Sequence, residues 1–247
     1  MASQTLLGID TSTLSISVAL VRLEADGSWR TLASRDRGAS GPNHSTLLPG
    51  WVDELLGETG LTLAGLDGVA VSLGPGSFTG LRIALATGKG LAYGAEIPLA
   101  GASSLEAMAL AAARLAPDAA AVVPILDARK QEVYAGFFRP VAGGVEALGD
   151  GPAEVVAKPE RVAERLASLE GPLVLLGEGY FAYRAIFDEA TAGLRAPPLD
   201  GLPETPPAAE VAVLGFRTPQ TFSKSAIFAL EPHYLRPSEA ELKRQAS

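Results

Sequence analysis

Several short polar segments of this 247-residue chain carry residue types that could hold a phosphate group. The run Asp10-Thr11-Ser12-Thr13 follows the apolar residues 6–9, so its hydroxyls and backbone amides could bind phosphate while Asp10 positions a cation or a water. Asp127 follows a second apolar run. The alternative for Asp10 is structural, because an aspartate that ends a strand commonly accepts hydrogen bonds from the turn after it.

The glycine-rich segment 74–76 is weak evidence for a nucleotide. A loop that precedes a helix can hold phosphate on its free amides, but this one lacks the GKS or GKT ending of a P-loop and the spacing of a dinucleotide fingerprint. Its two glycines and Pro75 indicate a tight turn, and Ser77 or Thr79 could cap the helix that follows.

The helix predicted over residues 79–93 is apolar around most of its circumference. At about 100° per residue, only Arg82, Lys89 and Tyr93 fall in one polar arc. Small residues recur at every fourth position, which would let another backbone approach: Gly80, Ala84, Gly88 and Ala92. Because such a helix is buried on more than one side, one face must cover the chain's own sheet. The second layer comes either from the same chain or from a partner subunit.

Composition places the chain among globular proteins and argues against several kinds of functional site. Hydrophobic residues make up 47% and charged residues 19%, and no apolar run reaches the ~20 residues of a membrane span. We therefore expect a soluble protein without a signal peptide. The absence of cysteine excludes thiolate chemistry, and His44 and His233 leave little for a metal site. The net charge of -8 opposes binding of a phosphate backbone.

The predicted helices and strands that would position these polar segments follow a similar order in the two halves of the chain. The first half has strands at 6–10, 15–21 and 29–37, a helix from His44, a strand before Gly74, the helix 79–93, a strand at 97–100 and a helix at 104–115. After Pro117-Asp118 come strands at 121–127, 132–138 and 144–156, the last with a bulge or turn at 149–151. A helix at 159–169, a strand at 173–176 and a helix to about Ala190 follow. A proline-rich connection at 195–207, a helix at 208–216 and an ordered turn or strand at 230–237 complete the chain. We predict an α/β fold of two lobes, residues 1–116 and 117–247, each a mixed sheet flanked by helices.

This layout resembles the ribonuclease H-like (ASKHA) superfamily of actin, Hsp70 and hexokinase, and Asp10-Thr11-Ser12-Thr13 resembles its first phosphate loop. Four segments give a more specific match to one family: IDTST, HSTLLP, GPGSFTGLRIALATGKGLA and ILDARKQEVYAGFF. In order and spacing they are similar to the TsaB (YeaZ) family. The similarity covers about residues 6–138, and beyond them it extends to the layout and the final Tyr-Leu-Arg.

The resemblance implies a cytoplasmic, non-catalytic subunit for threonylcarbamoyl transfer to the adenosine that follows the anticodon in tRNAs reading codons that begin with A. It implies pairing with the paralogue TsaD, which carries the metal and the catalytic site, and a complex completed by the ATPase TsaE. Threonylcarbamoyl adenylate, the donor, would come from another enzyme. The chain would meet tRNA only through the complex, and purified alone it could form a homodimer.

The residues themselves also indicate lost catalysis. Asp127 is followed by Ala128-Arg129-Lys130, whose side chains would crowd a phosphate, and the glycine cluster expected to bind adenosine is reduced to Gly177-Glu178-Gly179. A metal-binding helix of the HxxxH kind would need a second imidazole where the chain has Leu48. We predict no cofactor and no metal, with degenerate phosphate loops marked by Asp10, Thr11, Ser12 and Asp127.

The predicted docking surface uses helices 45–56 and 79–93, which would form a helical bundle with the matching pair of a partner. The side chains predicted at this contact are Leu48, Trp51, Val52, Leu55, Leu81, Ala84, Leu85 and Gly88. Packing against the chain's own second lobe would instead bury some of them.

Three other functions are alternatives to this interpretation of the sequence. An active ATP-dependent kinase or hydrolase would place Asp10 and Asp127 on either side of a magnesium nucleotide, and a metallopeptidase would need more ligands than two histidines. A direct tRNA-binding module conflicts with the acidic charge balance, although Arg129-Lys130 could touch RNA.

Overall fold

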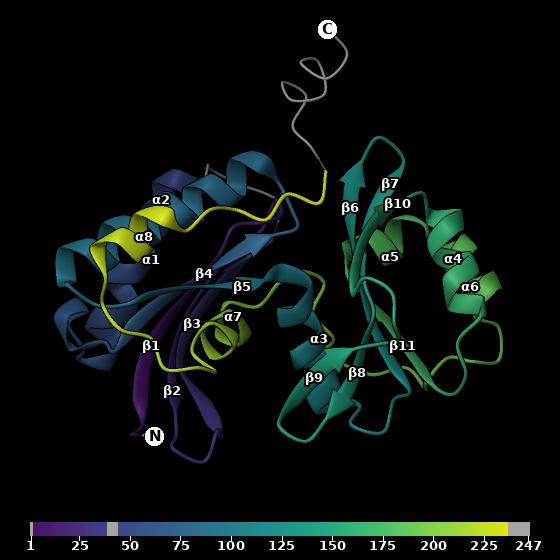
Figure 1. The fold of residues 1–247 in the computed structure, drawn as a ribbon, viewed down its shortest axis with the longest axis horizontal. Coiled ribbons are helices and arrows are strands. Elements are labelled where there is room, and N and C mark those ends of the chain that lie inside the picture. Colours follow the sequence, from purple (N-terminus) through teal and green to yellow (C-terminus); the bar gives the residue numbers. More distant parts are fainter. Residues whose placement is uncertain (1, 39–43, 237–247) are drawn as a thin grey trace, which may run out of the picture.

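The computed structural model describes residues 2–38 and 44–236, which form two α/β lobes side by side (Figure 1). The first lobe has a five-stranded sheet of order β3-β2-β1-β4-β5. Its strands are β1 (Gln4–Asp10), β2 (Ile16–Leu23), β3 (Trp29–Arg37), β4 (Gly68–Gly74) and β5 (Leu99–Ser103). The first three form an antiparallel meander, and β4 and β5 continue the sheet in parallel with β1. The helical elements are α1 (His44–Thr59), η1 (Leu63–Gly65), α2 (Phe78–Ala95) and α3 (Ser104–Leu115).

The second lobe has a six-stranded sheet of order β10-β7-β6-β8-β9, with β11 parallel to β6. Its strands are β6 (Ala121–Arg129), β7 (Glu132–Gly136), β8 (Phe138–Val141), β9 (Gly144–Ala147), β10 (Glu154–Ala157) and β11 (Leu173–Leu176). Its helices are α4 (Pro159–Ala167), α5 (Glu178–Ala182) and α6 (Arg184–Ala190). The boundary predicted after residue 116 follows the end of α3 and stays a prediction, because α3 packs on both sheets.

Two of the predicted strands are wrong in their extent. The predicted strand 132–138 is interrupted at Phe137, a fully buried residue whose amide bonds the Ala153 carbonyl. This break places β7 and β8 on opposite sides of β6. The predicted strand 144–156 is accordingly two strands, β9 beside β8 and β10 beside β7, and the turn between them contains Gly149.

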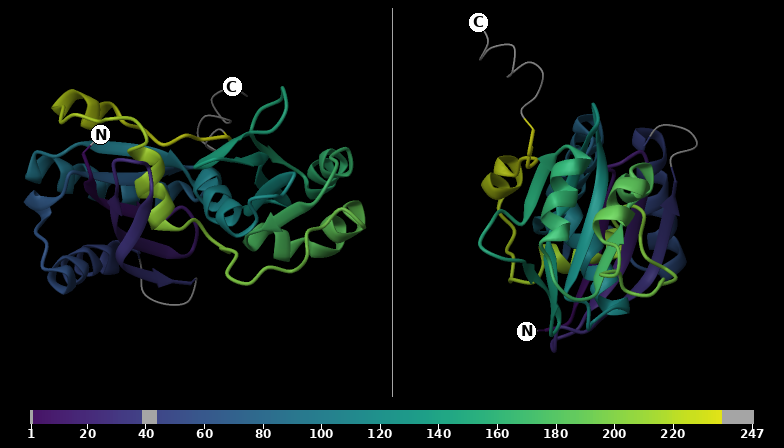
Figure 2. Two further views of the ribbon diagram at one scale, coloured as in Figure 1. Left: turned by 90° about the horizontal axis from the view of Figure 1, so that it is seen from below. Right: turned by 90° about the vertical axis from the view of Figure 1, so that its right-hand side faces the viewer.

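The two faces of the first sheet are covered by different parts of the chain. Alternate strand residues such as Leu7, Ile9 and Val18 pack under α1 and α2, whereas Leu6, Ala19 and Ala70 face α3 and α7 (Ala208–Gly215). This alternation follows from the two-residue repeat of a strand. The segment after the second lobe thus returns to the first lobe (Figure 2).

Close backbone packing fixes α7 on the first sheet. A Cβ on Gly8 would lie 1.9 Å from the Ala208 carbonyl oxygen, so glycine is required there. The Ala208 amide donates to Ser17 Oγ at 3.0 Å. After α7, the short helix α8 (Lys224–Ala229), which the sequence did not predict, packs on α2.

A buried carboxyl group lies where α7 meets α3. Glu210 is 6% exposed, and its Oε1 lies 3.7 Å from Nη1 of Arg114. Burial outweighs the guanidinium and raises the pKa of Glu210 from 4.5 to about 7. Between these two values the folded chain retains a proton that the unfolded chain releases. The free energy of unfolding therefore falls as pH rises through this range, by about 1.4 kcal/mol per pH unit from this group alone.

We expect Glu210→Gln to raise the free energy of unfolding at pH 8 by roughly 1 to 3 kcal/mol and to change it little at pH 5, because the amide carries no charge to bury. Urea unfolding at both pH values measures this difference. Glu164→Gln, in the exposed Arg161–Glu164 pair, is the matched control and should shift stability by less than about 0.5 kcal/mol at either pH. An equal effect of Glu210→Gln at pH 5 and pH 8 would contradict the assignment.

Candidate functional site

The first predicted phosphate loop is joined to the start of α2. Asp10 ends β1 and is 1% exposed, and its Oδ1 accepts the Ser12 amide at 3.1 Å. The Thr11 hydroxyl donates to the Gly80 carbonyl at 2.7 Å, and the Ser12 carbonyl accepts the Ser77 amide at 2.6 Å. Two donors that could bind a phosphate, the Thr11 hydroxyl and the Ser77 amide, therefore have partners within the chain, whereas the buried Ser12 Oγ has no hydrogen-bond partner among the described residues.

Glycine makes this contact possible. A Cβ on Gly80 would lie 1.8 Å from the Thr11 carbonyl oxygen, and one on Gly76 would lie 2.3 Å from the Ser12 carbonyl oxygen. Ser77 caps α2, as predicted, by accepting the Gly80 amide. The glycines and the cap thus serve contact between loop and helix.

In the second predicted phosphate loop, the Asp127 carboxylate pairs with Arg129 of the same loop. Asp127 Oδ1 accepts the Arg129 amide at 2.8 Å, and Oδ2 pairs with Arg129 Nη1 at 3.1 Å. Arg129, Lys130 and Gln131 are consecutive non-glycine residues with φ of 60°, 54° and 61°. Such left-handed residues cost on the order of 1 kcal/mol each. A phosphate loop needs free backbone amides, and the Arg129 amide of this turn is already bonded to Asp127.

The third predicted loop, Gly177-Glu178-Gly179, packs against β6. A Cβ on Gly177 would lie 2.4 Å from the Ile125 carbonyl oxygen, and one on Gly179 would lie 2.6 Å from the Leu126 carbonyl carbon. Burial, followed by repulsion from Asp127, raises the pKa of Glu178. These glycines therefore bring α5 close to the sheet.

The two histidines are far apart in the sequence and are described to different extents. Residues 2–38 and 44–236 contain no group of three or more histidine, aspartate and glutamate side chains that could hold a metal ion. His233 lies at the end of β4 through its backbone, whose amide donates to the Leu73 carbonyl at 2.7 Å. His44 begins α1, but its side chain lies outside the described part of the chain.

Most of the side chains predicted to dock a partner lie inside the first lobe. Buried there are Leu48, Val52, Leu55, Leu81, Ala84, Leu85 and Gly88, whereas Trp51 is half-buried. A Cβ on Gly88 would lie 2.5 Å from Val71 Cγ1. The stripe of small residues from Gly80 to Ala92 therefore faces the chain's own sheet. The predicted docking side chains other than Trp51 are therefore wrong, because they are buried and a partner can reach only the opposite faces of α1 and α2.

A second stripe of small residues lies on the outer face of α2. Its members Ala86, Gly90 and Gly94 are exposed, and a Cβ on either glycine would meet nothing within 4 Å. On α1, Gly50 and Gly57 are likewise exposed. Sequence reasoning missed this face because both stripes of α2 have the same four-residue spacing.

Helix α8 contacts part of the polar arc of α2, in which Arg82 and Tyr93 remain exposed. Lys89 Nζ donates to the Phe228 carbonyl at 3.0 Å, and the rings of Tyr93 and Phe228 lie 5.7 Å apart. Lys224 Nζ lies 5.3 Å from the centre of the Tyr93 ring. This arc was predicted to face water.

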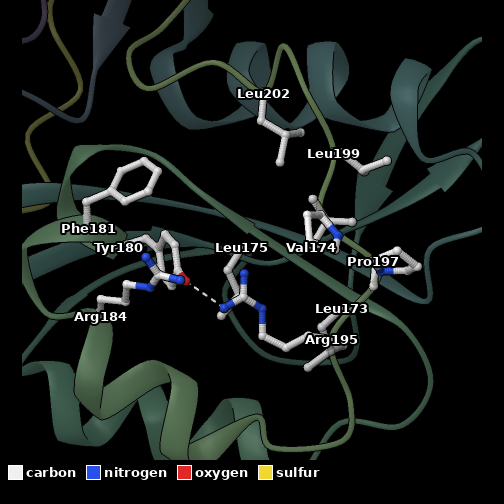
Figure 3. A pocket seen from close by; sticks show the side chains of 12 residues that line it. Leu173, Val174, Leu175, Tyr180, Phe181, Arg184, Arg195, Pro197, Leu199 and Leu202 are labelled. Carbon is white, nitrogen blue, oxygen red and sulfur yellow. Dashed lines mark hydrogen bonds between the residues drawn. The ribbon is translucent and has the colours of Figure 1, made fainter.

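A pocket of about 380 Å³ in the second lobe shares no residue with either phosphate loop (Figure 3). It lies between β11, α5 and residues 195–202. Arg184 and Arg195 both pair with Asp188, and Tyr180 donates to the same carboxylate. Leucine and proline form most of the remaining lining, so its charges are already paired within the lobe.

Comparison with known proteins identifies the family. Residues 39–243 match the family described as TsaD: tRNA N6-adenosine threonylcarbamoyltransferase. The tRNA threonylcarbamoyladenosine biosynthesis protein TsaB of Escherichia coli (strain K12) is 33% identical over 95% of this chain and 96% of its own length. The chain belongs to the TsaB (YeaZ) family. TsaB of Bacillus subtilis (strain 168) is 28% identical over 97% of both chains.

A solved TsaB-family structure confirms the predicted fold. YeaZ from Pseudomonas aeruginosa superposes with a TM-score of 0.68 and 29% identity over 95% of this chain and 100% of its own. The predicted two-lobed α/β fold and the resemblance to TsaB are thus confirmed. In the described residues, no helix has both the length and the apolar character needed to cross a membrane.

We expect Gly80→Ala to lower the free energy of unfolding by about 1 to 3 kcal/mol or more, because the new methyl group collides with the Thr11 backbone. Gly90→Ala, on the open face of the same helix, should be neutral or stabilise by up to about 1 kcal/mol. Urea unfolding of the two variants compares them with the parent. Similar effects of both substitutions would show that the loop and α2 are not in contact.

Proposed function

We propose that this chain is a non-catalytic subunit of tRNA threonylcarbamoyladenosine biosynthesis that docks TsaD in the cytoplasm. The observation that carries the proposal is the 33% identity with TsaB of Escherichia coli over 95% of the chain. TsaD would supply the metal and the catalytic site, and TsaE would join the complex. The formal net charge of -8 supports contact with tRNA through the complex rather than by this chain alone.

The loops between the lobes support a non-catalytic role. The first loop uses the Thr11 hydroxyl and the Ser12 carbonyl to bind α2, and the second holds Asp127 in contact with Arg129. Replacing these contacts by a magnesium nucleotide would require both loops to reorganise. We therefore assign no cofactor to the chain.

The outer faces of α1 and α2 are the proposed docking surface. Exposed Ala86, Gly90 and Gly94 would let a partner's helix backbone approach closely, as small residues do where two helices pack tightly. Half-buried Trp51 and Leu91 belong to the same two helices and offer apolar area for contact. In the absence of TsaD, the same surface would join two copies of the chain, which gives the homodimer.

We expect Ala86→Arg and Gly90→Arg to weaken binding of TsaD by at least about tenfold, because a long charged side chain would stand in the gap between the helices. Co-purification of the co-expressed subunits and assay of modified adenosine in a reconstituted reaction measure the loss. Circular dichroism should show an unchanged fold. Ala185→Arg, at an exposed helical alanine of α6, is the matched control and should retain the complex. Intact complexes with all three variants would refute this surface.

The rival function, an ATP-dependent kinase or hydrolase, makes an opposite prediction for the isolated chain. We expect calorimetry with ATP and magnesium to detect no tight binding and no turnover, because the Thr11 hydroxyl and the Asp127 carboxylate already have partners within the chain. Asp127→Asn should leave tRNA modification by the reconstituted complex within about twofold of the parent. Tight binding with turnover that Asp127→Asn abolishes would establish the rival.

A further inference from the structure

A segment near the C-terminus passes from the first lobe to the second (Figure 1). Residues 231–236, which we call the strap, follow α8 and lie on the end of β4 and the start of α2. The His233 amide donates to the Leu73 carbonyl at 2.7 Å. The Tyr234 ring stacks on Phe78 with centroids 5.2 Å apart and planes inclined by 28°. A Cβ on Gly74 would lie 2.7 Å from the His233 carbonyl oxygen, so glycine admits the strap.

The other end of the strap is bound to the second lobe by one side chain. Arg236 Nη2 donates to the Ala128 carbonyl at 2.7 Å and lies 2.9 Å from Glu132 Oε2. The two side chains of the ion pair are 21% and 34% exposed. Both acceptors flank the β6–β7 turn, and a hydrogen bond between ionised groups is stronger than a neutral one. The strap therefore has specific contacts in both lobes.

The strap lies opposite the other main connection between the lobes. Helix α3 packs on both sheets, and in Figure 1 it lies below the point where the strap crosses above β4 and β5. At the start of α3, the Ser103 hydroxyl also contacts Glu154 of β10. Two bodies joined at one edge by a helix can still change their angle, whereas a second tie at the opposite edge restricts that motion.

We propose that the strap is an intramolecular tie that holds the two lobes together across the two degenerate phosphate loops. In the first lobe, the strap contacts residues next to Ser77, whose amide donates to the Ser12 carbonyl. In the second lobe, its contacts flank the turn after Asp127. Loss of the Arg236 contacts frees the second lobe at this edge. The angle between the lobes then varies, and both loops become more accessible to water.

The full-length variant Arg236→Ala tests the tie by amide hydrogen exchange and small-angle X-ray scattering of the isolated chain. We expect exchange to rise by roughly threefold or more in residues 127–134 and in residues 73–80, together with a larger radius of gyration. Arg139→Ala is the matched control, because Arg139 and Glu146 form an exposed ion pair within the second lobe. It should change neither the exchange of residues 73–80 nor the radius.

A double-mutant comparison shows whether Arg236 acts through its ion pair. Glu132→Ala alone should raise exchange in the same two segments, and combining it with Arg236→Ala should add little, because the two side chains share one contact. Faster exchange confined to residues 230–236, with an unchanged radius, would overturn the tie, as would fully additive effects of the two substitutions. These measurements use no TsaD, so their outcome is separate from that of the docking experiment.

Discussion

The start of α2 lies in backbone contact with the turn after β1, and this contact constrains both faces of the first lobe. Gly80 meets the Thr11 carbonyl and Gly88 meets Val71, so the helix axis lies closer to the sheet than side chains would allow. The same approach directs the Thr11 hydroxyl to the Gly80 carbonyl. Packing of the helix and pairing of the Thr11 hydroxyl therefore occur together.

That arrangement would connect the proposed loss of catalysis with the proposed docking role. The inner face of α2 binds the Thr11 hydroxyl, and the outer face presents Ala86, Gly90 and Gly94. A helix with small residues on both sides can pack closely against its own sheet and against a second protein. One element would thus serve both the proposed docking of a partner and the proposed loss of catalysis.

Local signals predicted most of the framework. Alternating apolar residues located the meander, and Ser103-Ser104 marked the start of α3. The spacing of small residues could not show which face of α2 lies inward, because Gly88 and Gly90 belong to stripes with equal periods. The interruption at Phe137 and the return of Ala208 to Ser17 depend on contacts between residues distant in sequence. Those contacts leave no local pattern in the sequence, so neither the break at Phe137 nor the C-terminal packing could be predicted from it.

The turn after Asp127 shows how a degenerate loop can remain well defined. Its left-handed residues 129–131 cost on the order of 1 kcal/mol each, which a free turn would relieve by changing conformation. At one end the Asp127 carboxylate holds the Arg129 amide. At the other, Arg236 binds both Ala128 and Glu132. The turn keeps its shape because both lobes contribute to holding it, so its conformation and the angle between the lobes are coupled through the strap.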